Sequence, residues 1–157
     1  MSRRPPKPIP GKSSPSWRFA IIAARFNEEI VDELLRRCTT RLGEAHIAEK
    51  NVQIFRVPGA FELPVAAKLA ADSGKFAAVI CLGAVIRGDT PHFDFVAGEA
   101  ARGIQRVALD TGIPIIFGVL TTNTEKQALD RLSTAVRAAD AAIEMAQLAY
   151  TLAARRL

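Results

Sequence analysis

The residue types best suited to chemistry gather in one short segment, the loop Gly88-Asp89-Thr90 and His92 just after it. Gly88 removes side-chain bulk, and Asp89 or Thr90 can cap a following helix. Pro91 suits the first helical position, where a missing N–H costs nothing. Backbone amides left free at a helix N-terminus bind phosphate readily. The segment therefore predicts a phosphate site, although an ordinary strand-to-helix turn with a good cap would use the same residues.

His92 is expected in the first turn of the helix that this loop begins. An imidazole in that position could accept and return protons during a reaction, a role worth about 10²–10⁴ in rate. A surface or capping histidine is the alternative, but the neighbouring glycine loop favours the catalytic interpretation. His46 is expected at the end of an earlier helix, far from this loop, and we interpret it as structural.

Four further side chains fall where a ligand could use them. Phe26 and Phe117 each follow or end a predicted strand, and the pair could hold a planar heterocycle between them by stacking. Arg131 could bind a phosphate bidentately, and Glu62 could accept hydrogen bonds from substrate hydroxyls. Each has a simpler alternative: core packing for the two phenylalanines, a solvated helix for Arg131, and support of a helical first turn for Glu62.

The elements that must position these residues alternate along the chain. Hydrophobic periodicity predicts strands over 17–24, 52–57, 76–82 and 114–119, with a loop over 83–91. It predicts helices over 28–45, 61–73, 92–111, 125–137 and 138–154. This order is typical of an α/β fold, with right-handed crossovers, a four-stranded parallel sheet and helices on both faces. Ligands bind outside the carboxyl ends of such strands, where most of the candidate residues fall.

The amino-acid composition limits which classes of protein this chain can belong to. The chain has 157 residues, 49% of them hydrophobic, which suits one domain over 17–157 behind a flexible, basic, Pro-rich arm over 1–16. Much of the excess of 21 basic over 16 acidic residues lies at the two ends, so we interpret it as solvated tails. Nucleic-acid binding through the arm is the alternative. The final helix is apolar almost all round, which predicts a subunit interface.

The two cysteines and the apolar runs indicate where the protein works. Cys38 and Cys81 fall in apolar patterns without CxxC spacing, so we interpret them as reduced packing residues and not as metal ligands. The first residues lack the apolar core of a signal peptide. No apolar run approaches the roughly 20 residues of a membrane span. We therefore expect a soluble, cytoplasmic protein.

Four segments of this chain, in order and spacing, resemble lumazine synthases. They are residues 25–27 (RFN), 57–64 (VPGAFELP), 83–94 (GAVIRGDTPHFD) and 117–123 (FGVLTTN). The resemblance runs from about Arg18 to the C-terminus. It implies a flavodoxin-like three-layer sandwich and a transferase reaction, the penultimate step of riboflavin biosynthesis. In that step 5-amino-6-(D-ribitylamino)uracil condenses with 3,4-dihydroxy-2-butanone 4-phosphate to give 6,7-dimethyl-8-ribityllumazine, phosphate and water, without cofactor or metal.

The resemblance also implies a role for each matching residue. Those implied to bind the pyrimidine and its ribityl chain are Phe26, Ala60, Phe61, Glu62, Ala84, Val85, Ile86 and, from a neighbouring subunit, Phe117. Those implied to bind phosphate are Gly88, Asp89, Thr90 and Arg131, while His92 would transfer protons. The implied partners are the two small-molecule substrates and further copies of the chain, because family members form homopentamers and some build larger capsids.

One segment departs from the family pattern. Family members usually carry a Gly- and Lys-rich stretch between the last two helices, with a lysine one turn after the phosphate arginine. Here residues 131–140 are expected to continue straight through as helix, and Ala135 stands where that lysine would be. A non-catalytic flavin- or lumazine-binding protein on the same fold is the alternative function, although binding alone would need neither His92 nor Arg131.

Overall fold

A four-stranded parallel sheet forms the centre of the molecule. The structure is a computed structural model that describes residues 4–9 and 13–154. The strands are β1 (Phe19–Ala24), β2 (Val52–Val57), β3 (Ala78–Ile86) and β4 (Ile115–Thr122), in the spatial order β2-β1-β3-β4. Every neighbouring pair is parallel. The expected sheet and its strand number are confirmed for the described residues. Parts of the predicted arm, 1–3 and 10–12, lie outside them.

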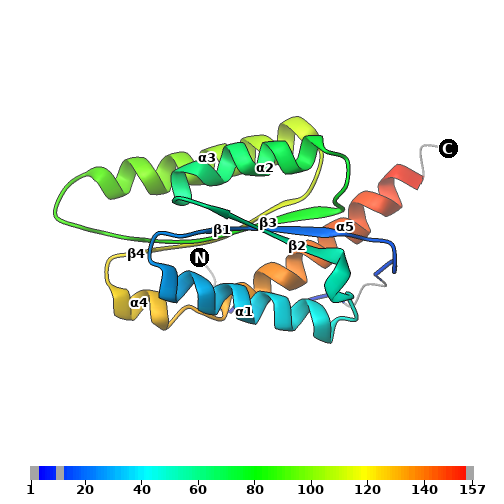
Figure 1. Cartoon of the computed structure of the whole chain (residues 1–157), viewed down its shortest axis with the longest axis horizontal. Helices are drawn as coiled ribbons and strands as arrows, with labels where there is room; N and C mark the ends of the chain where they lie inside the picture. Colours follow the sequence, from blue (N-terminus) through cyan, green and yellow to red (C-terminus); the bar gives the residue numbers. More distant parts are fainter. Residues whose placement is uncertain (1–3, 10–12, 155–157) are drawn as a thin grey trace.

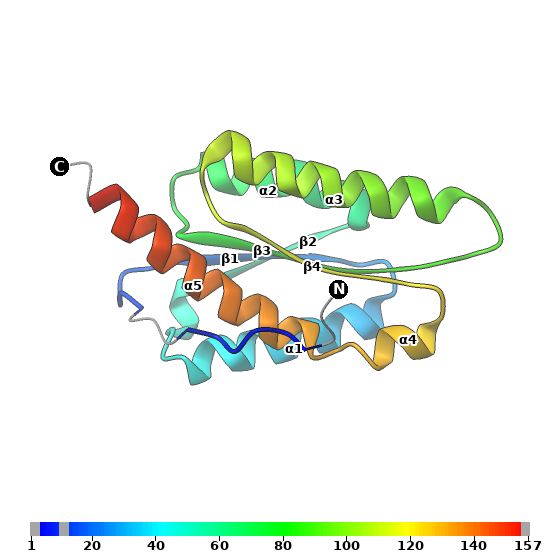
Figure 2. The same cartoon turned by 180° about the vertical axis from the view of Figure 1, so that it is seen from behind.

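Helices cover both faces of this sheet. They are α1 (Glu28–Glu44), α2 (Leu63–Asp72), α3 (His92–Thr111), α4 (Glu125–Leu129) and α5 (Thr134–Ala154), with two short 3-10 turns, η1 (Glu49–Asn51) and η2 (Ala60–Glu62). Figure 1 and the reverse view in Figure 2 show α2 and α3 on one face and α1, α4 and α5 on the other. The predicted three-layer α/β sandwich is therefore confirmed.

The central strand β1 divides the core in two. All six of its side chains are buried. Because successive side chains of a strand point to opposite faces, Phe19, Ile21 and Ala23 pack with α1 and α5. Ala20 and Ile22 pack with α2 and α3. A strand apolar on both faces is what a covered parallel sheet requires, and it explains the continuous apolar runs of the sequence.

Two strands run further than the sequence predicts. Strand β3 continues to Ile86, so the expectation of a loop from Gly83 onward was wrong. Strand β4 continues to Thr122. The extra residues pair with each other, from Gly83 with Val119 to Ile86 with Thr122. Inter-strand pairing thus outweighs the low strand propensity of the glycine, and it carries Ala84, Val85 and Ile86 to the edge of the sheet as ordered strand.

The break between the last two helices comes earlier in the sequence than predicted. Helix α4 ends at Leu129 and α5 begins at Thr134, so the expected straight helix over 125–137 is wrong. The intervening turn holds Arg131. It allows α5 to place Ala135, Ala138 and Ala139 in the core. A hinge between the two helices is therefore present despite the departure from the family's sequence pattern.

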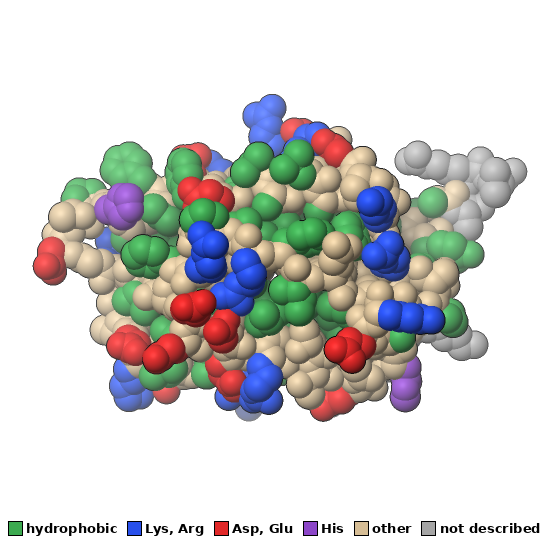
Figure 3. All heavy atoms as spheres, viewed as in Figure 1, with side chains coloured by type: hydrophobic (Ala, Val, Ile, Leu, Met, Phe, Trp, Pro, Cys, Tyr) green, Lys and Arg blue, Asp and Glu red, His purple; other side chains and the backbone are tan. Residues whose placement is uncertain are grey.

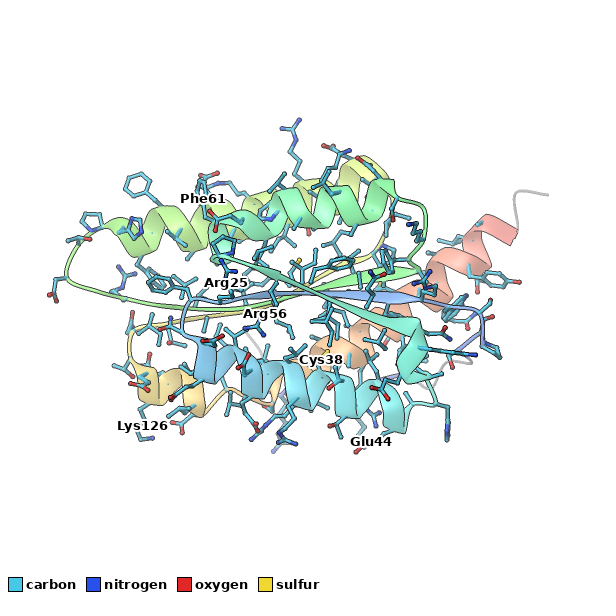
Figure 4. All side chains as sticks on the ribbon, viewed as in Figure 1. Arg25, Cys38, Glu44, Arg56, Phe61 and Lys126 are labelled. Atoms are coloured by element: carbon cyan, nitrogen blue, oxygen red, sulfur yellow. The ribbon has the colours of Figure 1, made fainter. Side chains whose placement is uncertain are left out.

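Both cysteines are packing residues. Cys38 and Cys81 are free and fully buried, and Cys38 points from α1 toward the sheet in Figure 4. Burial raises the pKa of each thiol to about 12, so both stay protonated at neutral pH and are poor nucleophiles. In the described part of the chain, no helix is long and apolar enough to cross a membrane.

Gly118 provides a test of the packing between β3 and β4. A methyl group there would lie 2.8 Å from the Cys81 carbonyl oxygen and 2.7 Å from Leu82 Cδ2. We expect Gly118→Ala to lower the free energy of unfolding by about 1–3 kcal/mol, because overpacking forces the strands apart. Gly43→Ala in α1 is the control, since nothing lies within 4 Å of its added methyl group. Urea unfolding should separate the two variants, and equal midpoints would contradict this account.

Candidate active site

One cavity of about 550 Å³ lies where β1 and β3 end and α3 begins. Its lining residues are Phe26, Asn27, Gly59, Ala60, Phe61, Glu62, Ala84, Val85, Ile86, Gly88, Thr90, His92, Phe93, Phe95 and Val96. In Figure 3, hydrophobic side chains gather over this end of the molecule, beside the start of α3. The cavity lies at the carboxyl ends of the strands, the position at which parallel sheets bind ligands.

Most of the residues singled out from the sequence meet in this cavity. Those that line it are Phe26, Ala60, Phe61, Glu62, Ala84, Val85, Ile86, Gly88, Thr90 and His92. Asp89, Phe117 and Arg131 are outside the lining set. Five further residues line the cavity that were not among the predicted site residues: Asn27, Gly59, Phe93, Phe95 and Val96. Asn27, Gly59 and Phe93 stand within segments that resemble lumazine synthases, whereas Phe95 and Val96 lie further along the helix and carry no such signal.

The first loop is fixed by Asn27. Its backbone is left-handed, with φ of 55°, a conformation that asparagine tolerates better than most residues. The side-chain Nδ2 donates to the Ala84 carbonyl at 2.8 Å, which ties the end of β1 to β3. The Asn27 carbonyl accepts from Ile30 and Val31 and so begins α1. The turn leaves Phe26 exposed on the cavity wall, with 73% of its surface accessible.

The second loop places Glu62. The Glu62 amide donates to the Gly59 carbonyl at 3.2 Å within the short turn before α2. A Cβ at position 59 would lie 3.2 Å from Glu62 Oε2, so a side chain there would crowd the carboxylate. Glycine at this position therefore leaves the Glu62 carboxylate room beside the cavity. Phe61, in the same turn, is exposed beside it.

The third loop leads into the long helix α3. His92 is the first helical residue, and its amide donates to Thr90 Oγ1 at 3.4 Å. Pro91 is the N-cap residue directly before the helix, which begins at His92 as the sequence predicts. The N-terminus of a helix carries a positive partial charge. Gly88, Asp89, Thr90 and His92 are all exposed there, so an anion could approach the loop.

Phe117 and Arg131 lie away from the cavity of their own chain. Phe117 is the third residue of β4, opposite Cys81, and therefore does not stand at a strand end as the sequence suggested. The extension of β4 to Thr122 explains the difference. Arg131 lies in the turn after α4, where its Nη1 donates to the Gln127 carbonyl at 2.9 Å. Both side chains are exposed.

The lining defines what the cavity can bind. Its walls are mainly aromatic and aliphatic, with Glu62 as the one carboxylate and His92 as the one imidazole among the described lining residues. That set suits a planar ring with polar substituents. No lysine or arginine is among the described lining residues. Within the described residues, no group of three or more His, Cys, Asp and Glu side chains could hold a metal ion.

The sequence matches a known family over most of its length. Residues 16–150 match the family described as 6,7-dimethyl-8-ribityllumazine synthase. A protein of that name from Desulfatibacillum aliphaticivorans is 49% identical, covering 92% of this chain and 97% of the relative. Another, from Syntrophus aciditrophicus (strain SB), is 50% identical over 83% of this chain and 88% of its own.

A third relative of the same name, from Desulfosudis oleivorans, is 45% identical and covers 88% of this chain and 91% of its own length. The matched region includes every loop that forms the cavity. The sequence motifs, the parallel sheet and the cavity at its carboxyl edge all agree with this match. The chain belongs to the 6,7-dimethyl-8-ribityllumazine synthase family.

Proposed function

We propose that this chain condenses 5-amino-6-(D-ribitylamino)uracil with 3,4-dihydroxy-2-butanone 4-phosphate to give 6,7-dimethyl-8-ribityllumazine, as a transferase of riboflavin biosynthesis. Membership of the family supports the reaction. The observation that carries the proposal is the cavity itself, which combines an aromatic wall with Glu62 and with His92 at a helix N-terminus. We further propose that residues 17–157 form the one catalytic domain and that the enzyme works in the cytoplasm.

The pyrimidine substrate occupies the apolar part of the cavity. Phe26 stacks on the ring, because an exposed aromatic side chain offers a flat apolar surface at low entropic cost. Ala84, Val85 and Ile86 form the opposite strand wall. The ribityl chain runs past Ala60, Phe61 and Glu62, and the Glu62 carboxylate accepts hydrogen bonds from its hydroxyl groups.

The phosphate ester binds at the start of α3. Gly88, Asp89 and Thr90 form the loop, and the free amides and positive end of the helix attract the anion. A phosphate carries more charge than the helix end alone can balance. Because no basic side chain is among the described lining residues, Arg131 supplies the balancing charge from outside this chain's cavity.

The reaction needs proton transfer at three points. The 5-amino group attacks the ketone and water leaves to form a Schiff base. Phosphate is then eliminated, and the ribityl nitrogen closes the second ring with loss of another water. Holding the two substrates in register supplies much of the rate. His92, between the phosphate loop and the ring wall, moves the protons. These steps are condensations and eliminations, which need no redox cofactor.

The working enzyme is a homopentamer whose sites lie between subunits. Phe117 and Arg131 are exposed and lie outside their own chain's cavity, so they serve the site of a neighbour, where Phe117 covers the pyrimidine ring opposite Phe26. The outer side of α5 also exposes apolar residues that an interface would bury, among them Met145, Leu148 and Leu152. Sedimentation of the purified protein would test this, and a monomer with full activity would refute it.

Turnover of the purified protein tests the reaction itself. Lumazine formation from the two substrates is followed by absorbance and fluorescence against the uncatalysed rate. We expect a clear enhancement that requires the phosphate ester. No enhancement, with tight binding of a ribityl pyrimidine retained, would instead assign the chain as a non-catalytic lumazine-binding protein.

His92→Ala should slow turnover without weakening substrate binding. Removal of a general acid–base group costs about 10²–10⁴ in rate, and we expect the lower part of that range because proximity still contributes. The dissociation constant of a ribityl pyrimidine should stay unchanged in a fluorescence titration. His46→Asn is the control, because asparagine tolerates the left-handed backbone at His46, where φ is 67°. Unchanged turnover in His92→Ala would remove His92 from the mechanism.

Arg131→Ala should affect one substrate selectively. We expect the KM for the phosphate ester to rise roughly tenfold or more, since a charge-assisted hydrogen bond contributes about 1.5–3 kcal/mol, while the KM for the pyrimidine stays constant. Lys126→Ala is the matched control. It removes a positive charge from the outer side of α4, as Figure 4 shows, where Lys126 forms an ion pair with Asp130. A parallel rise in both KM values would indicate structural damage instead.

Mixed oligomers test the shared site. Co-expressed His92→Ala and Arg131→Ala chains should recover part of the activity that each variant lacks alone, because some interfaces then combine an intact His92 with an intact Arg131. The readout is the rate per chain after purification through two different tags. Activity no higher than that of the two separate variants would place both residues in one subunit's site.

A further inference from the structure

Arg87 lies next to the cavity without lining it, and it contacts strand β4, the turn after β4 and helix α3. It follows β3 directly, and its amide donates to the Thr122 carbonyl at 2.9 Å, which continues the pairing of β3 with β4. Its neighbours Ile86 and Gly88 line the cavity, whereas Arg87 is not among the lining residues. The side chain is therefore directed away from the ligand space, although the backbone on either side borders it.

The guanidinium group contacts two side chains in the first turn of α3. Its Nη2 and Nη1 donate to the two Asp94 carboxylate oxygens at 3.0 and 3.4 Å. The same group lies over the Phe93 ring, 4.3 Å from its centroid, within the range of a cation–π contact. Phe93 and Asp94 directly follow His92 in the helix. Arg87 thus contacts the two residues that follow His92 in the first turn of α3.

The other side of the guanidinium group leads to the turn that holds Arg131. Arg87 Nε donates to Asn123 Oδ1 at 3.1 Å. The Asn123 amide donates to Gln127 Oε1 at 2.8 Å, and the Gln127 carbonyl accepts from Arg131 Nη1 at 2.9 Å. This chain of contacts joins the first turn of α3 to α4 across the end of the sheet. Arg87 is its branching point.

We propose that Arg87 is a positioning residue, which sets the place of His92 through Phe93, Asp94 and Asn123. The assignment rests on the proposed function. Three of the five N–H groups of Arg87 donate to protein acceptors. Arg87 is also not among the residues that line the cavity, so it acts on the substrates indirectly. Lysine cannot reproduce these contacts, because they need a planar group with several donors in fixed directions.

We expect Arg87 to contribute more to catalysis than to the stability of the fold. The side chains of Arg87 and Asp94 are 41% and 61% exposed, and ion pairs with that exposure contribute little to the free energy of unfolding. A small displacement of His92 has a larger effect on the reaction, since misplacement by about 1 Å can cost roughly 10²-fold in rate. Loss of Arg87 should therefore change kcat far more than Tm.

The test compares Arg87→Ala, Arg87→Lys and Asp94→Ala with Arg106→Ala. Arg106 pairs with Asp110 near the far end of the same helix, which makes it a control for the loss of a surface ion pair. We expect kcat to fall about tenfold to a hundredfold in Arg87→Ala, with little recovery in Arg87→Lys. Both KM values, and the Tm relative to Arg106→Ala, should stay nearly constant. Arg87→Ala combined with Asp94→Ala should be no worse than either alone, because the two act as one unit.

Three results would overturn the proposal while leaving the reaction in place. The first is a kcat in Arg87→Ala equal to that in Arg106→Ala. The second is a selective rise in the KM for the phosphate ester at constant kcat, which would make Arg87 a direct phosphate ligand. The third is a joint loss of Tm and of both substrate affinities, which would make it structural. Wild-type protein without turnover would refute the proposed function and this assignment together.

Discussion

Strand β1 pairs in parallel with β3 along almost its whole length, from Phe19 opposite Ala78 to Ala23 opposite Leu82. Parallel strands end at the same edge of a sheet, so the loops that follow them must face each other there. The hydrogen bond from Asn27 to the Ala84 carbonyl closes this meeting point. The cavity is a consequence of that pairing, because its walls come from segments far apart in the sequence and only the sheet brings them together.

The two hydrophobic cores on either side of β1 have different roles. The core shared with α2 and α3 ends beneath the cavity, since both helices begin at loops that line it. Helix α5 contributes mainly small side chains to the core shared with α1, such as Ala138, Ala142 and Ala146, and these let it approach the sheet closely. Arg41 donates to Asp140 at 2.6 Å and joins α1 to α5. On this side, among the described residues, only the Phe26–Asn27 loop before α1 reaches the cavity, whereas the other lining loops lead into α2 and α3.

Local pattern was sufficient for the helices with one clear apolar stripe and for most strand starts. Helix α3 begins and ends as periodicity predicts, at His92 and Thr111. The ends of β1 and β2 were predicted correctly, at Ala24 and Val57. The ends of β3 and β4 were not, because Ala84–Ile86 become strand only through their partners in β4. The same limit affected the site. Short polar or glycine-containing motifs identified the loop residues, whereas Phe93, Phe95 and Val96 line the cavity because of the direction in which α3 leaves the sheet.

Burial of β1 at the centre of the sheet also has a consequence for synthesis. Its six apolar residues are made before either of the strands that flank them. Translation adds about 5–20 residues per second, so the strand waits several seconds before Ala78–Ile86 can emerge and pair with it. Until first Val52–Val57 and then Ala78–Ile86 have been made, the apolar segment has at least one strand edge without its partner, and that edge can pair with other nascent chains. The central strand of the sheet is thus the strand that waits longest for its partners.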